Sequence, residues 1–167
     1  MYKCGDFVVY GTGGVCCVEE VSTLDSDAAN KDRLYYVFKN IVTNGIAYVP
    51  VDSNVYLRPV MSKSEVEALL QKAPALSTDA FEKIPPRELQ KVYRDTLLSH
   101  DSLAILSLIK HICITSKKKQ LLKKKLSITE ERFLEQALKI MSSEFSISLG
   151  IDLESAKNHI LTCLNID

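Results

Sequence analysis

The sequence predicts an α+β chain of two domains, in which a small five-stranded β-barrel precedes a compact all-α helical bundle. Up to about residue 60, β-branched and aromatic residues come in short runs that are separated by turn residues. Beyond residue 60 the apolar residues recur at helical spacing. We therefore assign residues 1–60 to the barrel and residues 61–167 to the bundle.

The barrel is expected to contain five strands, at residues 7–10, 15–21, 34–38, 46–51 and 55–60. The polar residues 22–33, which include Asp25, Asp27 and Asn30, predict a loop. Asn44-Gly45 is the dipeptide of a type I′ turn and predicts a tight hairpin. Strands this short must curl together to bury a common core, which favours a Tudor- or SH3-like barrel.

The bundle is expected to contain five helices. Three of them should begin at an N-capping side chain, Ser62, Asp101 or Ser127, and the last helix should begin at Asp152. Glu65 and Glu130 complete capping boxes at two of these starts. The helix after Asp101 is apolar almost all round as far as Ile112, so we expect it at the centre of the bundle. The fifth helix is expected over residues 87–98, and prolines exclude a continuous helix over residues 73–86.

The composition predicts a cytoplasmic protein. Lys plus Arg equals Asp plus Glu at 21 each, so the overall charge does not point to nucleic acid. No stretch approaches the roughly 20 apolar residues of a transmembrane helix, and the N-terminus lacks a signal-peptide pattern. The five cysteines include no C-x-x-C pair, and adjacent Cys16 and Cys17 should point to opposite faces of a strand. We expect them to be reduced structural thiols.

No arrangement of residues predicts an enzyme. Residues 11–14 are glycine-rich but lack the Lys-Ser/Thr of a phosphate loop and precede a strand, which indicates a structural turn. The three histidines are far apart, and His111 and Cys113 fall on a largely apolar helix, where core positions are expected. Paired carboxylates and a nucleophile elbow are missing. We therefore expect no catalytic residue, no cofactor and no metal.

A basic segment is the clearest candidate site in the second half. From Ser102 to Thr129 the sequence has no acidic residue but seven lysines: Lys110, Lys117, Lys118, Lys119, Lys123, Lys124 and Lys125. Two interpretations are open for the two lysine triplets. They form either a solvated surface or a sequence-independent contact with DNA phosphates.

The order of these motifs resembles that of the CarD family of bacterial RNA polymerase-binding proteins. The family's K-x-G-D-x-V-V-Y strand is matched by residues 3–10, and the following Gly-Val by Gly14-Val15. Its central hairpin is matched by residues 35–50, and the motif that closes its N-domain by residues 57–60. The family's helix in the C-domain is matched by Leu126, Ser127, Glu130, Ala137, Met141 and Glu144.

The resemblance implies a transcription regulator. Its Tudor-like domain would bind the β subunit of RNA polymerase, and its helical domain would contact promoter DNA and change open-complex stability. The polymerase contact carries over to Val37, Tyr48 and Pro50, with the alternative that these are barrel residues, because the pattern does not show which strand face is buried. The candidate DNA contacts are Arg87, Lys91, Arg94 and Arg132, together with the lysines of the basic segment, which has no counterpart in the family pattern: Lys117, Lys118, Lys119, Lys123, Lys124 and Lys125.

The chain departs from the family where the family inserts a Trp wedge into the minor groove. It has no Trp, and the wedge position aligns near Pro86, beside Ile84 and Pro85. A family basic residue is Glu131 here, whereas Arg132 is kept. Two functions stay open: a regulator that contacts polymerase and promoter DNA, and an adaptor that binds polymerase without DNA. For the first function we expect a nucleoid-associated monomer, with no membrane contact, that binds free DNA weakly and without sequence preference.

Overall fold

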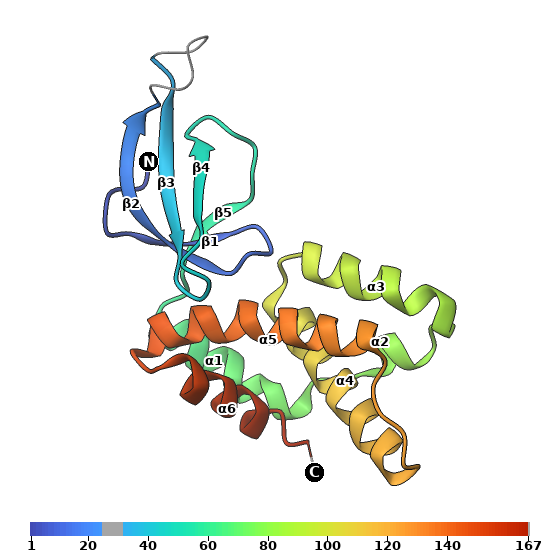
Figure 1. Ribbon diagram of the computed structural model, residues 1–167. Helices are drawn as coiled ribbons and strands as arrows, with labels where there is room; N and C mark the ends of the chain where they lie inside the picture. Colours follow the sequence, from blue (N-terminus) through green and yellow to red (C-terminus); the bar gives the residue numbers. More distant parts are fainter. Residues whose placement is uncertain (25–31, 167) are drawn as a thin grey trace. The chain divides into compact units, whose positions relative to one another are not determined.

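The computed structural model describes residues 1–24 and 32–166, which fall into two compact units, Met1–Val60 and Met61–Asp167 (Figure 1). The first is a five-stranded antiparallel sheet and the second is built from helices. The predicted α+β fold class, with strands first and helices second, is confirmed. Asp25, Asp27 and Asn30 of the predicted loop lie outside the described residues.

The strands are β1 (Phe7–Tyr10), β2 (Val15–Thr23), β3 (Leu34–Asn40), β4 (Ile46–Pro50) and β5 (Leu57–Pro59). Their order in the sheet is β4-β3-β2-β1-β5. The start of β2 pairs with β1, while β3 pairs along most of β2, and the β2–β3 register shifts between Val18 and Glu20. Such an irregularity bends a strand, which lets one long strand serve both halves of the sheet.

One face of the sheet carries the core of this unit: Val8, Cys16, Val18, Tyr36, Phe38 and Val49. The Tyr36 and Phe38 rings stack with centroids 5.3 Å apart. Because side chains alternate between the faces of a strand, Cys17 is only half-buried beside fully buried Cys16. The predicted separation of these two thiols is confirmed.

The predicted type I′ turn at Asn44-Gly45 is wrong. Asn44 has a left-handed φ of 56°, but Gly45 does not, and the connection between β3 and β4 spans residues 41–45. The Asn40 side chain accepts hydrogen bonds from the Val42 and Thr43 amides, and the backbone carbonyl of Asn40 accepts one from the Asn44 amide. This side chain organises a wider loop than the dipeptide alone indicates.

The second unit contains α1 (Lys63–Lys72), η1 (Ala73–Ala75), α2 (Asp79–Glu82), α3 (Pro86–Leu98), α4 (Ser102–Leu121), α5 (Ile128–Leu149) and α6 (Leu153–Cys163). The three predicted N-caps are confirmed, with capping boxes at Ser62 and Ser127, and Asp152 caps α6 at its predicted start. The proline-rich break holds η1 and the short α2, neither of which was predicted from the sequence. α4 continues past Ile112 to Leu121 and so includes the first lysine triplet.

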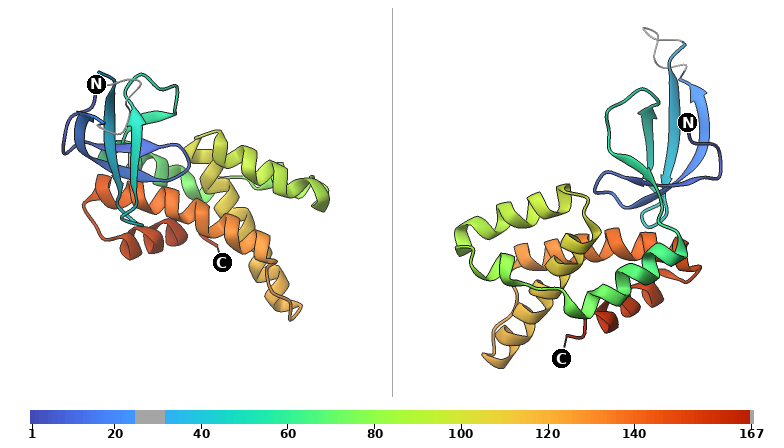
Figure 2. Two further views of the ribbon diagram at one scale, coloured as in Figure 1. Left: turned by 45° about the horizontal axis from the view of Figure 1, so that its top comes forward. Right: turned by 180° about the vertical axis from the view of Figure 1, so that it is seen from behind.

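The predicted central helix of the bundle was α4, but α5 holds that position. α5 packs against α1, α3, α4 and α6 (Figure 2). The N-terminal part of α4 is deeply buried, but its last turns are polar and exposed, so this helix is central over only part of its length. Within residues 1–24 and 32–166, no helix combines the length and hydropathy needed to cross a membrane.

Candidate functional site

The β3–β4 hairpin presents an apolar face on the side of the sheet away from the core. Val37 pairs directly with Tyr48, and Tyr35 pairs with Pro50. Tyr48 is 57% exposed and Ile46 is 47% exposed, whereas Val37 and Pro50 are half-buried. The structure thus brings Val37, Tyr48 and Pro50 together and decides which face is buried: all three lie outside the core cluster. Ile46 lies on the same face as Tyr48, as strand alternation indicates, but was not among the predicted contacts.

Charged residues flank this hairpin face. The Arg33 guanidinium lies over the Tyr35 ring, 5.9 Å from its centroid, and pairs with the Asp52 carboxylate at 2.9 Å. A second ion pair joins Lys39 to Glu19 at 3.5 Å. Protein interfaces commonly combine an apolar centre with a polar rim. The hairpin therefore has the chemistry of a docking surface.

A basic stripe runs along α3. Arg87, Lys91 and Arg94 follow one another at spacings of four and three residues, so they share one side of the helix, and all three are exposed. Tyr93 and Leu97 are buried on another side. Arg87 also lies 3.6 Å from Glu88, an exposed pair that leaves its guanidinium accessible.

The first lysine triplet is partly engaged within the fold. Lys119 Nζ donates to Glu130 Oε2 at 2.6 Å, and Lys117 Nζ donates to the Ile166 carbonyl. Lys110, on the same helix, donates to the Pro74 carbonyl at 2.7 Å. These lysines hold α4 against its neighbours, so only part of the predicted phosphate-binding charge is free.

The second triplet lies beyond the end of α4. The Lys123 amide donates to the Gln120 carbonyl and the Lys124 amide to the Lys119 carbonyl, with Lys123 in the left-handed region at φ 56°. This pair of bonds is a Schellman-type helix end. Lys123, Lys124 and Lys125 are exposed and, over the parts of the chain that the structure describes, form no ion pair.

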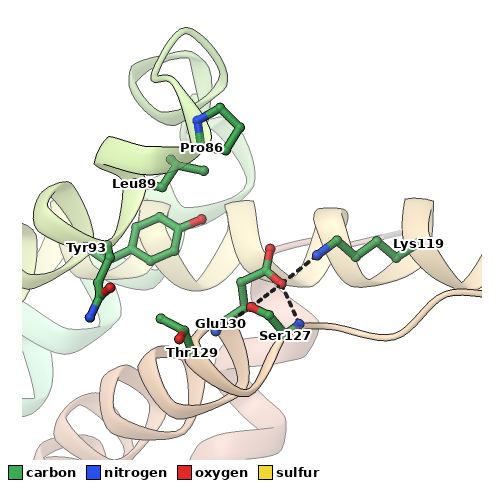
Figure 3. Close-up of a pocket in the computed structure, with 8 residues that line it drawn as sticks. Pro86, Leu89, Tyr93, Lys119, Ser127, Thr129 and Glu130 are labelled. Carbon is green, nitrogen blue, oxygen red and sulfur yellow. Dashed lines mark hydrogen bonds and ion pairs between the residues drawn. The ribbon is translucent and has the colours of Figure 1, made fainter.

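A pocket of about 300 Å³ lies where α3, the end of α4 and the start of α5 meet (Figure 3). Its lining residues are Pro86, Leu89, Gln90, Tyr93, Lys119, Ser127, Thr129 and Glu130. Burial by itself would raise the pKa of Glu130, but hydrogen bonds from Lys119 and Ser127 outweigh it and lower that pKa. The charged side chains that line the pocket, Lys119 and Glu130, are thus paired with each other. The pocket lining therefore offers no free acid or base.

An aromatic cluster lies behind this pocket. The Tyr93 hydroxyl lies 3.1 Å from His111 Nε2, and His111 stacks on Phe81 with centroids 5.1 Å apart. Burial, with a smaller contribution from Glu130, raises the pKa of Tyr93 to about 12, and burial lowers the pKa of His111. The predicted core position of His111 is confirmed. Burial also raises the pKa of the Cys113 thiol to about 11, which disfavours the thiolate form.

The position aligned with the family's wedge carries no projecting aromatic side chain. Ile84 is half-buried, Pro85 is the N-cap of α3, and Pro86 is its first residue. Arg132 is exposed, and its guanidinium lies over the Phe133 ring at 5.6 Å. Across residues 1–24 and 32–166, no group of three or more His, Cys, Asp or Glu side chains is arranged to hold a metal ion.

Two family models match the chain. Residues 2–61 match the model described as the CarD-like/TRCF RID domain, and residues 87–161 match the model described as CarD, C-terminal domain. The first match spans the sheet unit, and the second begins in α3 and ends in α6. No curated protein matches the chain.

Proposed function

Because the chain belongs to the CarD family, whose domains take part in RNA polymerase-interacting transcription regulation, we propose that it binds the polymerase β subunit and promoter DNA. Residues 1–60 form the proposed polymerase-interacting domain, and residues 61–167 form the proposed DNA-contacting domain. The observation that supports this proposal is the apolar hairpin face, whose side chains do not belong to the core of their own domain.

The hairpin face supports docking through a few central anchors. Tyr48 presents a large amphipathic ring at low conformational-entropy cost, and Tyr is among the residues enriched at interface hot spots. Val37 lies directly across the strand pair from it, and Pro50 follows on the same face. β4 is an edge strand of the sheet, and its exposed apolar face fits a partner surface that is also apolar and complementary in shape.

A pull-down with the purified β-subunit lobe, with and without promoter DNA, tests this docking. We expect Tyr48→Ala or Pro50→Arg to weaken binding by about 1–3 kcal/mol, since truncating a central anchor removes buried contact area. Val55→Ala is the matched control, because Val55 is 42% exposed but lies outside the hairpin face. If both hairpin variants fold normally and bind as tightly as the wild type, this face is not the docking surface.

For the helical domain we propose phosphate contacts from the α3 stripe, Arg132 and the exposed lysines. Ammonium and guanidinium groups can contact phosphates without reading bases. Since the net charge is zero, we expect only weak binding to free DNA, without sequence preference. Within a polymerase complex, the same contacts would stabilise the open promoter through charge.

The salt dependence of open-complex lifetime tests this charge-based stabilisation. Phosphate contacts release counterions, so the logarithm of the binding constant falls by about 0.9 per neutralised phosphate for each tenfold rise in salt. Changing Lys123, Lys124 and Lys125 to Gln should flatten this dependence more than changing Lys117, Lys118 and Lys119, because Lys117 and Lys119 are engaged within the fold. Binding to the β lobe serves as the control and should not change.

The second candidate function is an adaptor that binds polymerase without touching DNA. It is favoured by the missing Trp and by the internal partners of Lys117 and Lys119. Lifetimes that match the wild type at every salt concentration in both triplet variants would favour this function and make the lysines a solvated surface.

A further inference from the structure

The hairpin face continues onto β2, where it gains a carboxylate. Glu20 of β2 pairs with Val37 of β3, and Val37 pairs with Tyr48 of β4. These three strands are neighbours in the sheet (Figure 1). Because directly paired residues of antiparallel strands point to the same side, Glu20 lies on the same face as Val37 and Tyr48. Neighbouring strands lie about 4.8 Å apart, so Glu20 and Tyr48 are separated by roughly 10 Å across the sheet.

The irregularity in β2 places Glu20 on this face. In a regular strand that continued from buried Val18, alternation would turn Glu20 toward the core and Val21 away from it. The register shift between Val18 and Glu20 adds one residue, and Val21 therefore packs against the core cluster. Glu19, the added residue, contacts Lys39 on the outward face. Bulges of this kind commonly re-aim a side chain at a functional surface.

The charges around the hairpin face are not balanced. Both cations that flank it are paired, Lys39 with Glu19 at 3.5 Å and Arg33 with Asp52 at 2.9 Å. Glu20 is exposed, and its carboxylate forms no ion pair within the parts of the chain that the structure describes. One negative charge is thus left beside the apolar residues.

An unpaired carboxylate restricts the kind of surface that can cover this face. A purely apolar surface would remove water from Glu20 without replacing the lost hydrogen bonds, which is unfavourable. A Lys or Arg side chain on the partner replaces them and also attracts the carboxylate during encounter. An acidic surface or a nucleic acid phosphate would be repelled. The face therefore fits a protein surface that combines an apolar patch with a cation to one side of it.

We propose that Glu20 sets the charge specificity of polymerase docking by pairing with a Lys or Arg side chain of the β subunit. Val37, Tyr48 and Pro50 supply the apolar contact, and Glu20 selects and orients the partner surface. This inference rests on the proposed docking of the β subunit on the hairpin face. It adds a residue that lies outside the hairpin and names the chemistry of the side chain opposite it.

The test measures association and dissociation rates of the full chain with the purified β-subunit lobe at several NaCl concentrations. We expect wild-type binding to weaken as salt rises, because salt screens an exposed ion pair. Glu20→Lys should lower the affinity about tenfold at low salt, mainly through slower association, and should remove this weakening. Glu20→Gln should give an intermediate affinity. Glu135→Lys makes the same charge change at an exposed position of α5 and should bind like the wild type.

A charge-reversal scan of the lobe then identifies the partner side chain. Each exposed Lys or Arg of the lobe is changed to Glu in turn. One of these changes should weaken binding of the wild type and restore binding of Glu20→Lys, since the reversed pair is again attractive. Because Glu20 is exposed, neither of its substitutions should alter stability, which urea unfolding checks.

The outcomes separate this inference from the proposed function. If Tyr48→Ala weakens binding while Glu20→Lys binds like the wild type at every salt concentration, docking stands and the role of Glu20 is overturned. Tighter binding of Glu20→Lys would reveal an acidic partner surface and overturn it as well. Restoration by none of the lobe variants would exclude a specific cation opposite Glu20. A wild type that does not bind the lobe at all would overturn the proposed docking, and this inference with it.

Discussion

The two units of the chain differ in how they use their apolar residues. Among the described residues, the sheet unit buries a core cluster of six, and the helical unit buries one of twenty. The hairpin of the sheet unit buries one face and leaves Tyr48 and Ile46 exposed on the other, whereas the helices bury their apolar faces against one another. In the helical unit the exposed large apolar side chains lie at helix ends: Leu98, Leu121, Leu122 and Ile128. The sheet unit therefore offers a partner a continuous apolar face, whereas the helical unit exposes only single apolar side chains.

The largest expected effect tests whether the two cores are independent. Phe38→Ala in the sheet and Phe145→Ala in α5 each remove a fully buried ring and should each cost about 3–5 kcal/mol. Small domains have little stability to spare, so Phe38→Ala should unfold the sheet unit, while Phe145→Ala should leave a weakened bundle. Hydrogen exchange measured residue by residue checks this. Lost protection in both units from either single variant would contradict independent cores.

A smaller loss of stability is expected on removing the carboxylate of Glu144, which is buried in the helical unit. Glu144 is almost fully buried, and its Oε1 accepts a hydrogen bond from the Met61 amide at 2.9 Å. Glu144→Ala leaves that amide without this acceptor and should cost about 1–3 kcal/mol, whereas Glu144→Gln keeps an acceptor oxygen and should cost less. Urea unfolding measures both, with exposed Glu135→Ala on the same helix as the control. Equal stabilities for Glu144→Ala and Glu135→Ala would refute the role of this contact.

The smallest expected effect is a difference in acid sensitivity between the units. The pKa of His111 is lowered from 6.5 chiefly by burial, so the unfolded chain takes up this proton more readily than the folded one. The stability of the helical unit should therefore decline as the pH falls below about 6.5. The sheet unit has no histidine and should not share this decline.

Urea unfolding from neutral pH to about pH 5.5, followed separately in each unit, checks the acid sensitivity. His111→Phe keeps an aromatic ring against Phe81 but cannot titrate, so it should flatten the pH dependence of the helical unit. It also removes the polar partner of Tyr93, which adds a cost that does not vary with pH. An unchanged slope in this variant would show that another group is responsible.

The sequence-based predictions were most accurate where a structure depends on interactions between residues close together in the chain. The N-cap at Asp101 and the helix start at Asp152 were predicted correctly, because each carboxylate accepts from amides two or three residues away. The tight turn at Asn44-Gly45 was wrong, since the Asn40 side chain acts on a longer loop than that dipeptide. No prediction was made for Leu121 and Leu122, which are exposed at the end of α4.

The sequence by itself determined the division into strands and helices, the starts of four helices and the resemblance to the CarD family. These follow from local patterns that span a few residues. Only the tertiary structure decided that Tyr48 faces away from the core and that Lys119 is engaged while Lys123 is exposed. Both outcomes depend on pairings between distant parts of the chain, such as β4 with β3 and Lys119 with Glu130. A periodic pattern shows that one face is buried, but only packing selects which face it is.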